Sequence, residues 1–428
     1  MIHTLELSRM ISKAVFEAIL SSHQMKLYKN YLWVTDSFRD QGFSAIKLYK
    51  FKRPEVKGDS VEESDATHYY MISAIVNTGV MFHGDRHLSN NILSFTPDFE
   101  RAIIFNLLEI FPCLEICPEL RETNISEWAK YNTYKLRRID YVFEIKKNNQ
   151  QYLNMLNGGY TLRERYYTRN YYEDEEPLTD IPDEEPDIDE TEDYVEESGY
   201  TSDTQYIYYK GKSININIYH KGREIEKEKL LADENMDYDF LRIEVQVKKR
   251  KLNAIVEKFG LRGRELPYIA TPEVENFILK YYVQALTGSG AYVTLDRARA
   301  IINQSQFCES KKKKLEAVIT EVSNRHSIAV VLRKIEEGEI THLGKFATVR
   351  GYLKDIQSLG INPLTISGRM EKITPVSHLK NLSGGRDLED VVLPNILDMI
   401  EGYSEQIVEE RQRGRTYTQE ELDKIDRL

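Results

Sequence analysis

The sequence predicts an α+β fold, in which an antiparallel sheet with helices on one face is followed by a helical C-terminal domain. Two observations indicate this fold. Residues 138–145, 213–221 and 241–248 alternate apolar and polar side chains with a period of two, which is typical of half-buried antiparallel strands. Beyond about residue 252, apolar side chains instead recur at helical spacing. A chain of 428 residues is long enough for two to three structural units.

Local sequence patterns predict the strands and helices of the first half of the chain. Residues 1–7 are predicted to form a short strand and residues 8–22 a helix, and residues 68–77 form a second predicted strand. A helix is expected over residues 96–111, because Thr96 is a favourable N-cap and Pro97 occupies the first helical position.

Helices dominate the second half. Residues 271–286 and 310–323 have apolar side chains on one helical face, and the second of these begins with a run of four lysines, at positions 311–314. Residues 341–361 resemble the second helix of a helix-turn-helix motif and its exit, with Gly360 as the C-terminal cap. We therefore predict a sheet domain over residues 1–260, a helical, DNA-binding domain over 261–382, and a charged helical tail over 383–428.

The net charge of −11 conceals a basic remainder. Residues 173–203 contain 16 of the 69 acidic residues and no Lys or Arg, so 53 acids remain against 58 basic residues outside this block. A mildly basic remainder is compatible with DNA binding. The block is self-repelling and poor in large apolar groups, which predicts a disordered insertion. It is either a solvated loop or an inhibitory segment that imitates the charge of DNA.

Cysteine usage and hydropathy indicate a cytoplasmic protein. The three cysteines are an odd number in a long chain, which argues against a disulfide framework. No apolar run is long enough to cross a membrane, and the first residues do not have the pattern of a secretory signal.

If the three alternating segments share one sheet, their polar side chains gather on one face. That face would carry Asp140, Glu144, Asn217, Tyr219, Lys221, Arg242 and Glu244. Lys221 lies two residues beyond Tyr219 and therefore on the same face of its strand. Such a face is either an ordinary solvated surface or a site that combines a nucleophile, a cation and carboxylates.

Several motifs carry a resemblance to a known family. In order they are RIDYVFEI at 138–145, INIYHKGREIE at 216–226, FLRIEVQVKKRK at 240–251 and GKFATVRGYLKDIQSLGI at 344–361. Together they resemble the gene II replication initiators of filamentous phages and their relatives in Gram-positive bacteria. The pattern at Tyr219, Lys221 and Glu224 also resembles the nucleophile strand of staphylococcal-type rolling-circle plasmid initiators. At the position of His3 the family usually has an acid.

The resemblance implies rolling-circle replication initiation: an endonuclease that nicks and rejoins origin DNA through a 5′-phosphotyrosine intermediate. Tyr219 matches the nucleophile, and Lys221 would lower the cost of forming the phenolate or neutralise charge at the phosphate. A salt bridge from Lys221 to Glu224 or Glu244 is the alternative for this lysine.

The implied cofactor is Mg²⁺ or Mn²⁺, both of which prefer oxygen ligands. Asp140, Glu244 and Glu224 are the predicted ligands. The paired-histidine motif of the wider superfamily is absent, and whether His83 and His87 are ligands is open.

The implied partners are duplex and single-stranded origin DNA, together with the host replication helicase and polymerase. Arg242 and Lys248 are expected to contact DNA on the sheet, and Lys345, Arg350 and Lys354 on the C-terminal helices. The alternative function is that of a DNA-binding replication or copy-control protein without catalysis.

Overall fold

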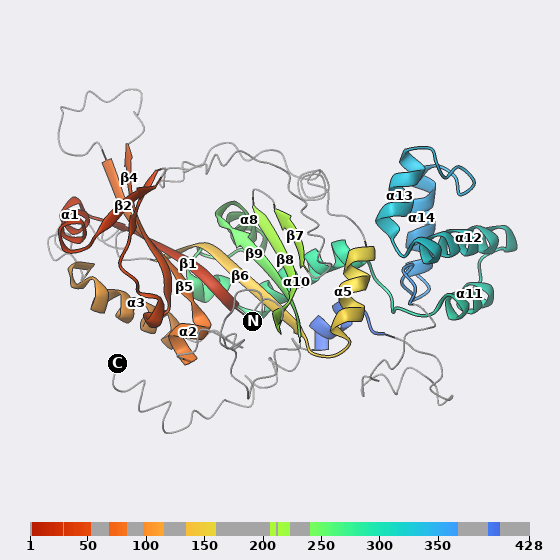
Figure 1. Ribbon diagram of the computed structural model, residues 1–428, viewed down its shortest axis with the longest axis horizontal. Helices are drawn as coiled ribbons and strands as arrows, with labels where there is room; N and C mark the ends of the chain where they lie inside the picture. Colours follow the sequence, from red (N-terminus) through yellow and green to blue (C-terminus); the bar gives the residue numbers. More distant parts are fainter. Residues whose placement is uncertain are drawn as a thin grey trace, which may run out of the picture.

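The computed structural model describes residues 2–28, 30–52, 68–83, 97–114, 134–159, 206–210, 213–222, 240–366 and 393–402. Its centre is one nine-stranded sheet in which every neighbouring pair of strands is antiparallel (Figure 1). The strand order is β2-β3-β4-β5-β1-β6-β9-β8-β7. The strands are β1 (Ile2–Ile11), β2 (Met25–Tyr28), β3 (Tyr31–Val34), β4 (Phe43–Lys52), β5 (His68–Asn77), β6 (Lys135–Ile145), β7 (Tyr206–Lys210), β8 (Ile214–His220) and β9 (Leu241–Lys248).

The three alternating segments are strands β6, β8 and β9, as predicted, and β9 lies between the other two. The predicted strand at 68–77 is confirmed as β5. The opening prediction is partly wrong, because β1 continues to Ile11 and helix α1 (Lys13–Ser22) begins only after the N-cap Ser12. Residues 8–11 stay extended because β1 is a central strand, which pairs along this stretch with β5.

The helices are α1 (Lys13–Ser22), α2 (Thr78–His83), α3 (Pro97–Ile110), α5 (Asn149–Gly158), α8 (Lys249–Phe259), α9 (Leu266–Ile269), α10 (Pro272–Thr287), α11 (Leu295–Gln304), α12 (Glu309–Arg325), α13 (Ile328–Glu336) and α14 (Phe346–Gln357). Helices α1, α3, α5, α8 and α10 bury apolar side chains in the same cluster as the apolar face of the sheet. The predicted α+β fold, with helices packed on one face of an antiparallel sheet, is confirmed. The opposite face is left to polar side chains and one small aromatic cluster.

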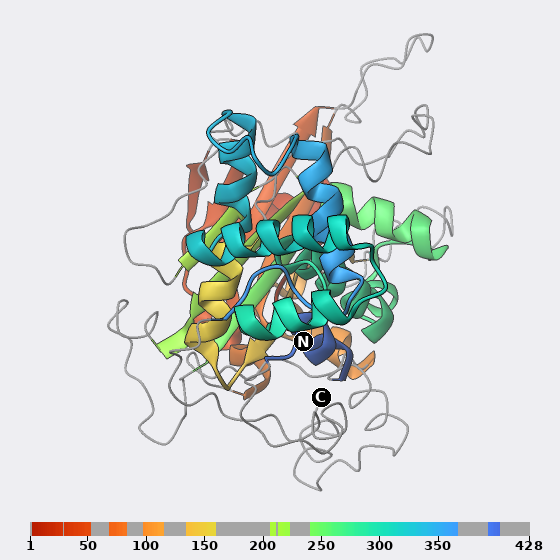
Figure 2. The ribbon, with the colours of Figure 1, turned by 90° about the vertical axis from the view of Figure 1, so that its right-hand side faces the viewer.

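Helices α11 to α14 form a group beyond one end of the sheet (Figures 1 and 2). Helix α10 lies beyond the predicted boundary at residues 260/261 and packs against β6 and β9. One apolar cluster also continues from the sheet into α11–α14, so the core has no break there. The predicted helix within 341–361 is α14, and Gly360 adopts a left-handed φ of 79° just beyond it.

Part of the predicted C-terminal tail docks back on the core. Leu393 pairs with Tyr292, while Ile396 and Ile400 are buried. The rest of the tail at 403–428 and the acidic block at 173–203 lie outside the described residues.

Gly290 supports the junction between the sheet layer and the α11–α14 group, and it yields a stability prediction. It has a φ of +90°, and a Cβ atom there would lie 2.5 Å from the backbone carbon of Ile361. Gly290→Ala should lower the free energy of unfolding by about 2–4 kcal/mol, through backbone strain and displacement of Ile361. Gly260→Ala is the matched control, because Gly260 also has a positive φ, of +61°, but open space around it. Its cost should be about 1 kcal/mol in urea titrations; equal losses would contradict the steric argument.

Within the part of the chain that the structure describes, no helix is both long and apolar enough to cross a membrane.

Candidate active site

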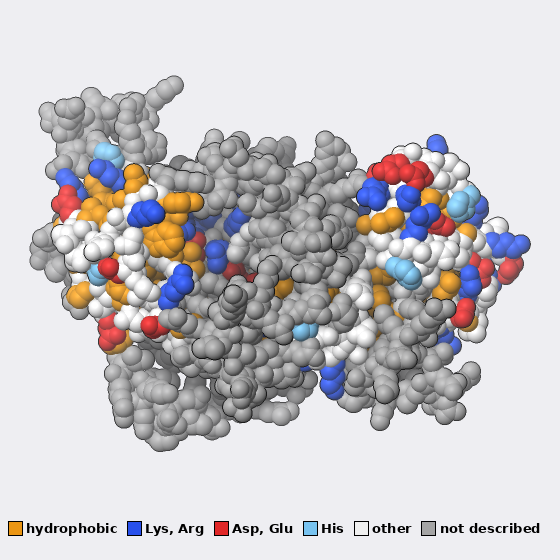
Figure 3. Space-filling view, in the orientation of Figure 1, with side chains coloured by type: hydrophobic (Ala, Val, Ile, Leu, Met, Phe, Trp, Pro, Cys, Tyr) orange, Lys and Arg blue, Asp and Glu red, His pale blue; other side chains and the backbone are white. Residues whose placement is uncertain are grey.

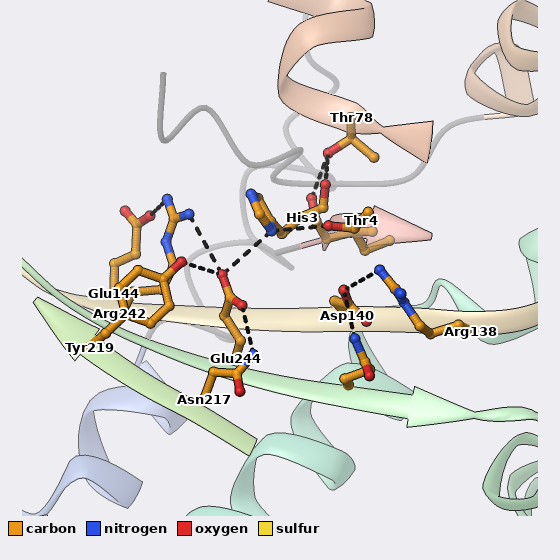
Figure 4. A network of polar contacts seen from close by, with 12 residues as sticks. His3, Thr4, Thr78, Arg138, Asp140, Glu144, Asn217, Tyr219, Arg242 and Glu244 are labelled. Atoms are coloured by element: carbon orange, nitrogen blue, oxygen red, sulfur yellow. Dashed lines mark hydrogen bonds and ion pairs between the residues drawn. The ribbon is translucent and has the colours of Figure 1, made fainter. Parts of the chain in front are cut away.

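The polar side chains of β6, β9 and β8 do gather on one face of the sheet, as predicted. The register places Arg242 of β9 between Glu144 of β6 and Tyr219 of β8, and Glu244 directly opposite Asn217. Since directly paired residues project from the same face of a sheet, these side chains lie side by side. They face away from the main apolar core, and Figure 4 shows them pointing toward one another.

Tyr219 and Glu244 form the shortest hydrogen bond of this group. The Tyr219 hydroxyl donates to Oε1 of Glu244 at 2.6 Å, and Nδ2 of Asn217 lies 3.5 Å from the other carboxylate oxygen. Lys221 Nζ lies 5.9 Å from the centre of the Tyr219 ring. The predicted nucleophile and its predicted cationic neighbour are therefore adjacent, and a carboxylate is in place to accept the phenolic proton.

Arg242 is buried and forms ion pairs with two carboxylates on this face of the sheet. Its guanidinium lies 2.7 Å from Glu144 Oε1 and 3.7 Å from Glu244 Oε1, and its side chain is only 1% exposed. Although burial opposes the charged form, the neighbouring acidic groups raise the pKa of Arg242 above its usual range. A guanidinium this deeply buried does not present a surface to DNA. We therefore assign Arg242 to positioning Glu244 and Tyr219 rather than to the predicted DNA contact.

His3 belongs to the site but was not among the residues predicted from sequence. A β-bulge between Ile2 and Thr4 adds one residue to β1 opposite β6, and His3 is that residue. Its Nδ1 lies 3.4 Å from Glu244 Oε1 and 3.1 Å from the Thr4 hydroxyl. The hydroxyl of Thr78 donates to the carbonyl oxygen of His3 at 2.9 Å, which fixes the backbone of the bulge. The one available signal was that the resemblance expects an acid at this position.

The charges of His3 and Glu244 follow from their surroundings. Burial, together with nearby cations, lowers the pKa of His3 to about 4, so its ring is neutral near pH 7. Burial would raise the pKa of Glu244, but its neighbours outweigh this effect and hold the pKa below its usual range. Since His3 is neutral at pH 7, the carboxylate is stabilised there by Arg242, the Tyr219 hydroxyl and the Asn217 amide.

Asp140 lies on the same face, toward the other end of β6. Its Oδ2 accepts hydrogen bonds from Arg138 at 3.1 Å and from Gln246 at 3.5 Å. Its Oδ1 is buried and has no hydrogen-bond partner among the described residues. Burial raises the pKa of Asp140 to about 6, and the negative charge of Glu244 adds to this effect.

A divalent cation fits part of this arrangement. Asp140 offers one oxygen without a partner, and Glu244 is its diagonal neighbour on β9. Mg²⁺ is commonly held by one or two carboxylates, with water and substrate phosphate completing the coordination. Over the described ranges, no group of three or more His, Cys, Asp or Glu side chains lies close enough to hold an ion. The site therefore suits a cation shared with a phosphate, not a cage made by protein alone, and the metal role of Asp140 and Glu244 stays a prediction.

The remaining predicted site residues that the structure describes lie in two regions, at the end of β9 and at α14. Lys248 ends β9 directly opposite Arg138, on the same face as Asp140. Lys345 and Lys354 are exposed at the start and end of α14, where the Arg350 guanidinium lies over the Phe346 ring at 5.8 Å. These three residues are far along the chain from the sheet site and form no part of it.

Two residues considered as metal ligands, Glu224 and His87, fall outside the described residues. His83 is described only as the last residue of α2. Tyr206, Tyr208 and Tyr209 lie on β7, which pairs with β8.

The fold and the site together define an α+β protein with a tyrosine, carboxylate and arginine network on the open face of its sheet. No protein-family model matches the chain, and no curated protein matches it either.

Proposed function

We propose that this protein is a rolling-circle replication initiator, which nicks and rejoins one strand of origin DNA through Tyr219. The observation that carries the proposal is the 2.6 Å hydrogen bond from the Tyr219 hydroxyl to Glu244 on the open face of the sheet. The motif pattern around Tyr219 and Lys221 supports the same assignment. A nucleophile that stays attached to the product conserves the energy of the broken phosphodiester for rejoining.

The site contains an acceptor for the proton that Tyr219 must lose in this reaction. A free phenol titrates near pH 10, so a tyrosine nucleophile needs a proton acceptor at neutral pH. As the Tyr219 oxygen bonds to phosphorus, its proton passes to Oε1 of Glu244. The 3′-oxygen of the upstream strand leaves and takes a proton from solvent, and rejoining reverses these steps. Arg242 holds the Glu244 carboxylate at the hydroxyl throughout.

The positive groups on this face favour the phosphate. Lys221 stands beside the Tyr219 ring, where it stabilises the extra negative charge of the transition state. Mg²⁺ or Mn²⁺ bound by Asp140 and Glu244 would polarise the scissile phosphate. Lys248 and Arg138 lie on the same face for contacts to the DNA backbone.

Duplex recognition is assigned to the C-terminal helices. Lys345 and Lys354 are exposed on α14, and Arg350 lies on the same helix. Such contacts would position origin DNA, while the sheet receives the strand to be cut. The partners that follow from this function are the origin in duplex and single-stranded form and the host helicase and polymerase.

The direct test uses single-stranded origin DNA from the same replicon, labelled at its 3′ end, with Mg²⁺ or Mn²⁺. Because the 5′-phosphate of the downstream fragment stays on Tyr219, we expect a labelled protein band that survives denaturation. Peptide mapping should place the label on Tyr219. Sequence-specific binding without any cleavage of that origin would instead support a non-catalytic DNA-binding replication or copy-control protein.

A further inference from the structure

A second group of aromatic side chains lies on the open face of the sheet, several strands away from Tyr219. The register places Trp33 opposite Lys47, Lys47 opposite Ser73, and Ser73 opposite Ser8 of β1. Ser8 shares its face with Thr4, which pairs with Asp140. The group is therefore on the same face as the candidate active site. We call it the aromatic surface, and its members are Tyr28, Tyr31, Trp33, Tyr49, Phe51 and Tyr69.

The aromatic surface has a buried floor and an exposed rim. Met10, Tyr49 and Met71 form a small apolar cluster that is separate from the main core. Tyr49 stacks on Phe51 with ring centres 5.6 Å apart. The Tyr31 ring lies between those of Tyr49 and Tyr28, with centre-to-centre distances of 5.5 Å and 5.4 Å. At the rim, Tyr28 is 46% exposed and Trp33 is 39% exposed. Two large aromatic side chains are therefore exposed to solvent beside a buried apolar cluster.

Basic side chains lie next to the rings of the aromatic surface. Lys47 lies over the Tyr31 ring at 5.0 Å and Arg137 over the Tyr49 ring at 5.4 Å. Both approach the carboxylate of Glu6 at 3.9 Å, so these three described side chains together carry a net positive charge. A β-bulge between Glu6 and Leu7 of β1 makes Arg137 the extra residue of β6 and turns it onto this face. Lys26, opposite Trp33 on the edge strand, adds an exposed positive charge.

Figure 3 shows hydrophobic and basic side chains next to one another over this end of the molecule, around β2 and β4. Interleaved aromatic rings and cations are the chemistry that holds single-stranded nucleic acid, because bases stack on the rings and phosphates meet the cations. A protein-docking surface would instead favour a larger contiguous apolar patch with a polar rim.

We propose that the aromatic surface binds single-stranded DNA and holds the strand whose cleavage is assigned to Tyr219. Strand β4 is five steps from β8 in the sheet, or about 24 Å at ~4.8 Å per step, a distance that several nucleotides span. That the bound strand is DNA rests on the proposed nicking function. The proposal that bases stack on the aromatic surface does not depend on that function.

The test measures binding of oligothymidine by intrinsic fluorescence. Trp33 and Trp128 are the two tryptophans of the chain, so Trp128→Phe makes Trp33 the sole reporter. In this background, oligothymidine should quench the Trp33 emission, and a duplex of random sequence should not. At one fixed salt concentration, Trp33→Ala and Tyr28→Ala in the otherwise unaltered chain should each weaken binding of fluorescently labelled oligothymidine by about 5- to 150-fold.

Leu27→Ala is the matched control. Leu27 is 70% exposed on the same edge strand, but it pairs with Leu32 and therefore projects from the opposite face. Its substitution should leave the affinity unchanged. Unaltered affinity in Trp33→Ala and Tyr28→Ala, or an equal loss in Leu27→Ala, would overturn the proposal, and so would equal quenching by duplex DNA.

Failure of this proposal can be separated from failure of the proposed function. Binding of oligothymidine is measured separately from cleavage of the origin strand. If Trp33→Ala binds as wild type while the covalent adduct still forms, only the aromatic surface loses its assigned role. If quenching occurs but no adduct ever forms, the surface binds single strands and the nicking assignment falls.

Discussion

Tyr219→Phe is expected to abolish the covalent protein–DNA adduct and strand cleavage, with residual activity below detection. The substitution removes one oxygen atom, which is the proposed nucleophile, and leaves the ring in its place on β8. Fold and DNA affinity should be preserved, because Glu244 loses the hydrogen bond from the hydroxyl but keeps Arg242 beside it. The measurement is adduct formation with the 3′-labelled origin strand, compared at equal protein and metal concentrations.

Tyr206→Phe is a suitable control for this experiment. Tyr206 pairs directly with Tyr219 across the β7–β8 hairpin, so both substitutions change the same small region of the sheet. We expect Tyr206→Phe to form the adduct at close to the wild-type level. Normal cleavage by Tyr219→Phe would refute the nucleophile assignment, and loss of cleavage in both variants would indicate general damage to the hairpin.

The largest effect on stability is expected for Arg242→Met. Methionine replaces the unbranched stem of the arginine side chain but leaves Glu144 and Glu244 buried without the guanidinium that they share. Breaking a buried ion pair from one side costs about 3–5 kcal/mol, because an uncompensated charge remains in the interior. Urea unfolding at neutral pH should show a loss of this size, and the double variant Arg242→Met/Glu144→Gln should recover part of it.

The control for Arg242 is an ion pair of similar type on the surface. Arg333 lies 3.9 Å from Glu337, but their side chains are 62% and 51% exposed. Arg333→Met should therefore cost less than about 1 kcal/mol. If Arg242→Met unfolds at the same urea concentration as wild type, the guanidinium does not stabilise the site in the way described.

Local patterns in the sequence were sufficient for the strands that carry the site. The alternation in β6, β8 and β9 identified each strand and the face on which its polar side chains lie, because side chains alternate strictly along an extended chain. Thus Tyr219, Glu244 and Asp140 could be placed on one surface before their contacts were known. Strands β2, β3 and β4 were not predicted, since β2 and β3 are short and the polar face of β4 carries aromatic residues that blur the alternation.

Sequence alone therefore determined the α+β class, the polar face and the candidate nucleophile of this protein. The tertiary structure decided which groups meet there. Arg242 and Lys248 looked alike as basic residues on one strand, yet the register buries Arg242 between two carboxylates. His3 and Arg137 reach the open face only through β-bulges, where β1 and β6 slip by one residue against each other. Such slips depend on pairing between residues more than a hundred positions apart, and a period-two pattern within one strand does not record where its partner has an extra residue.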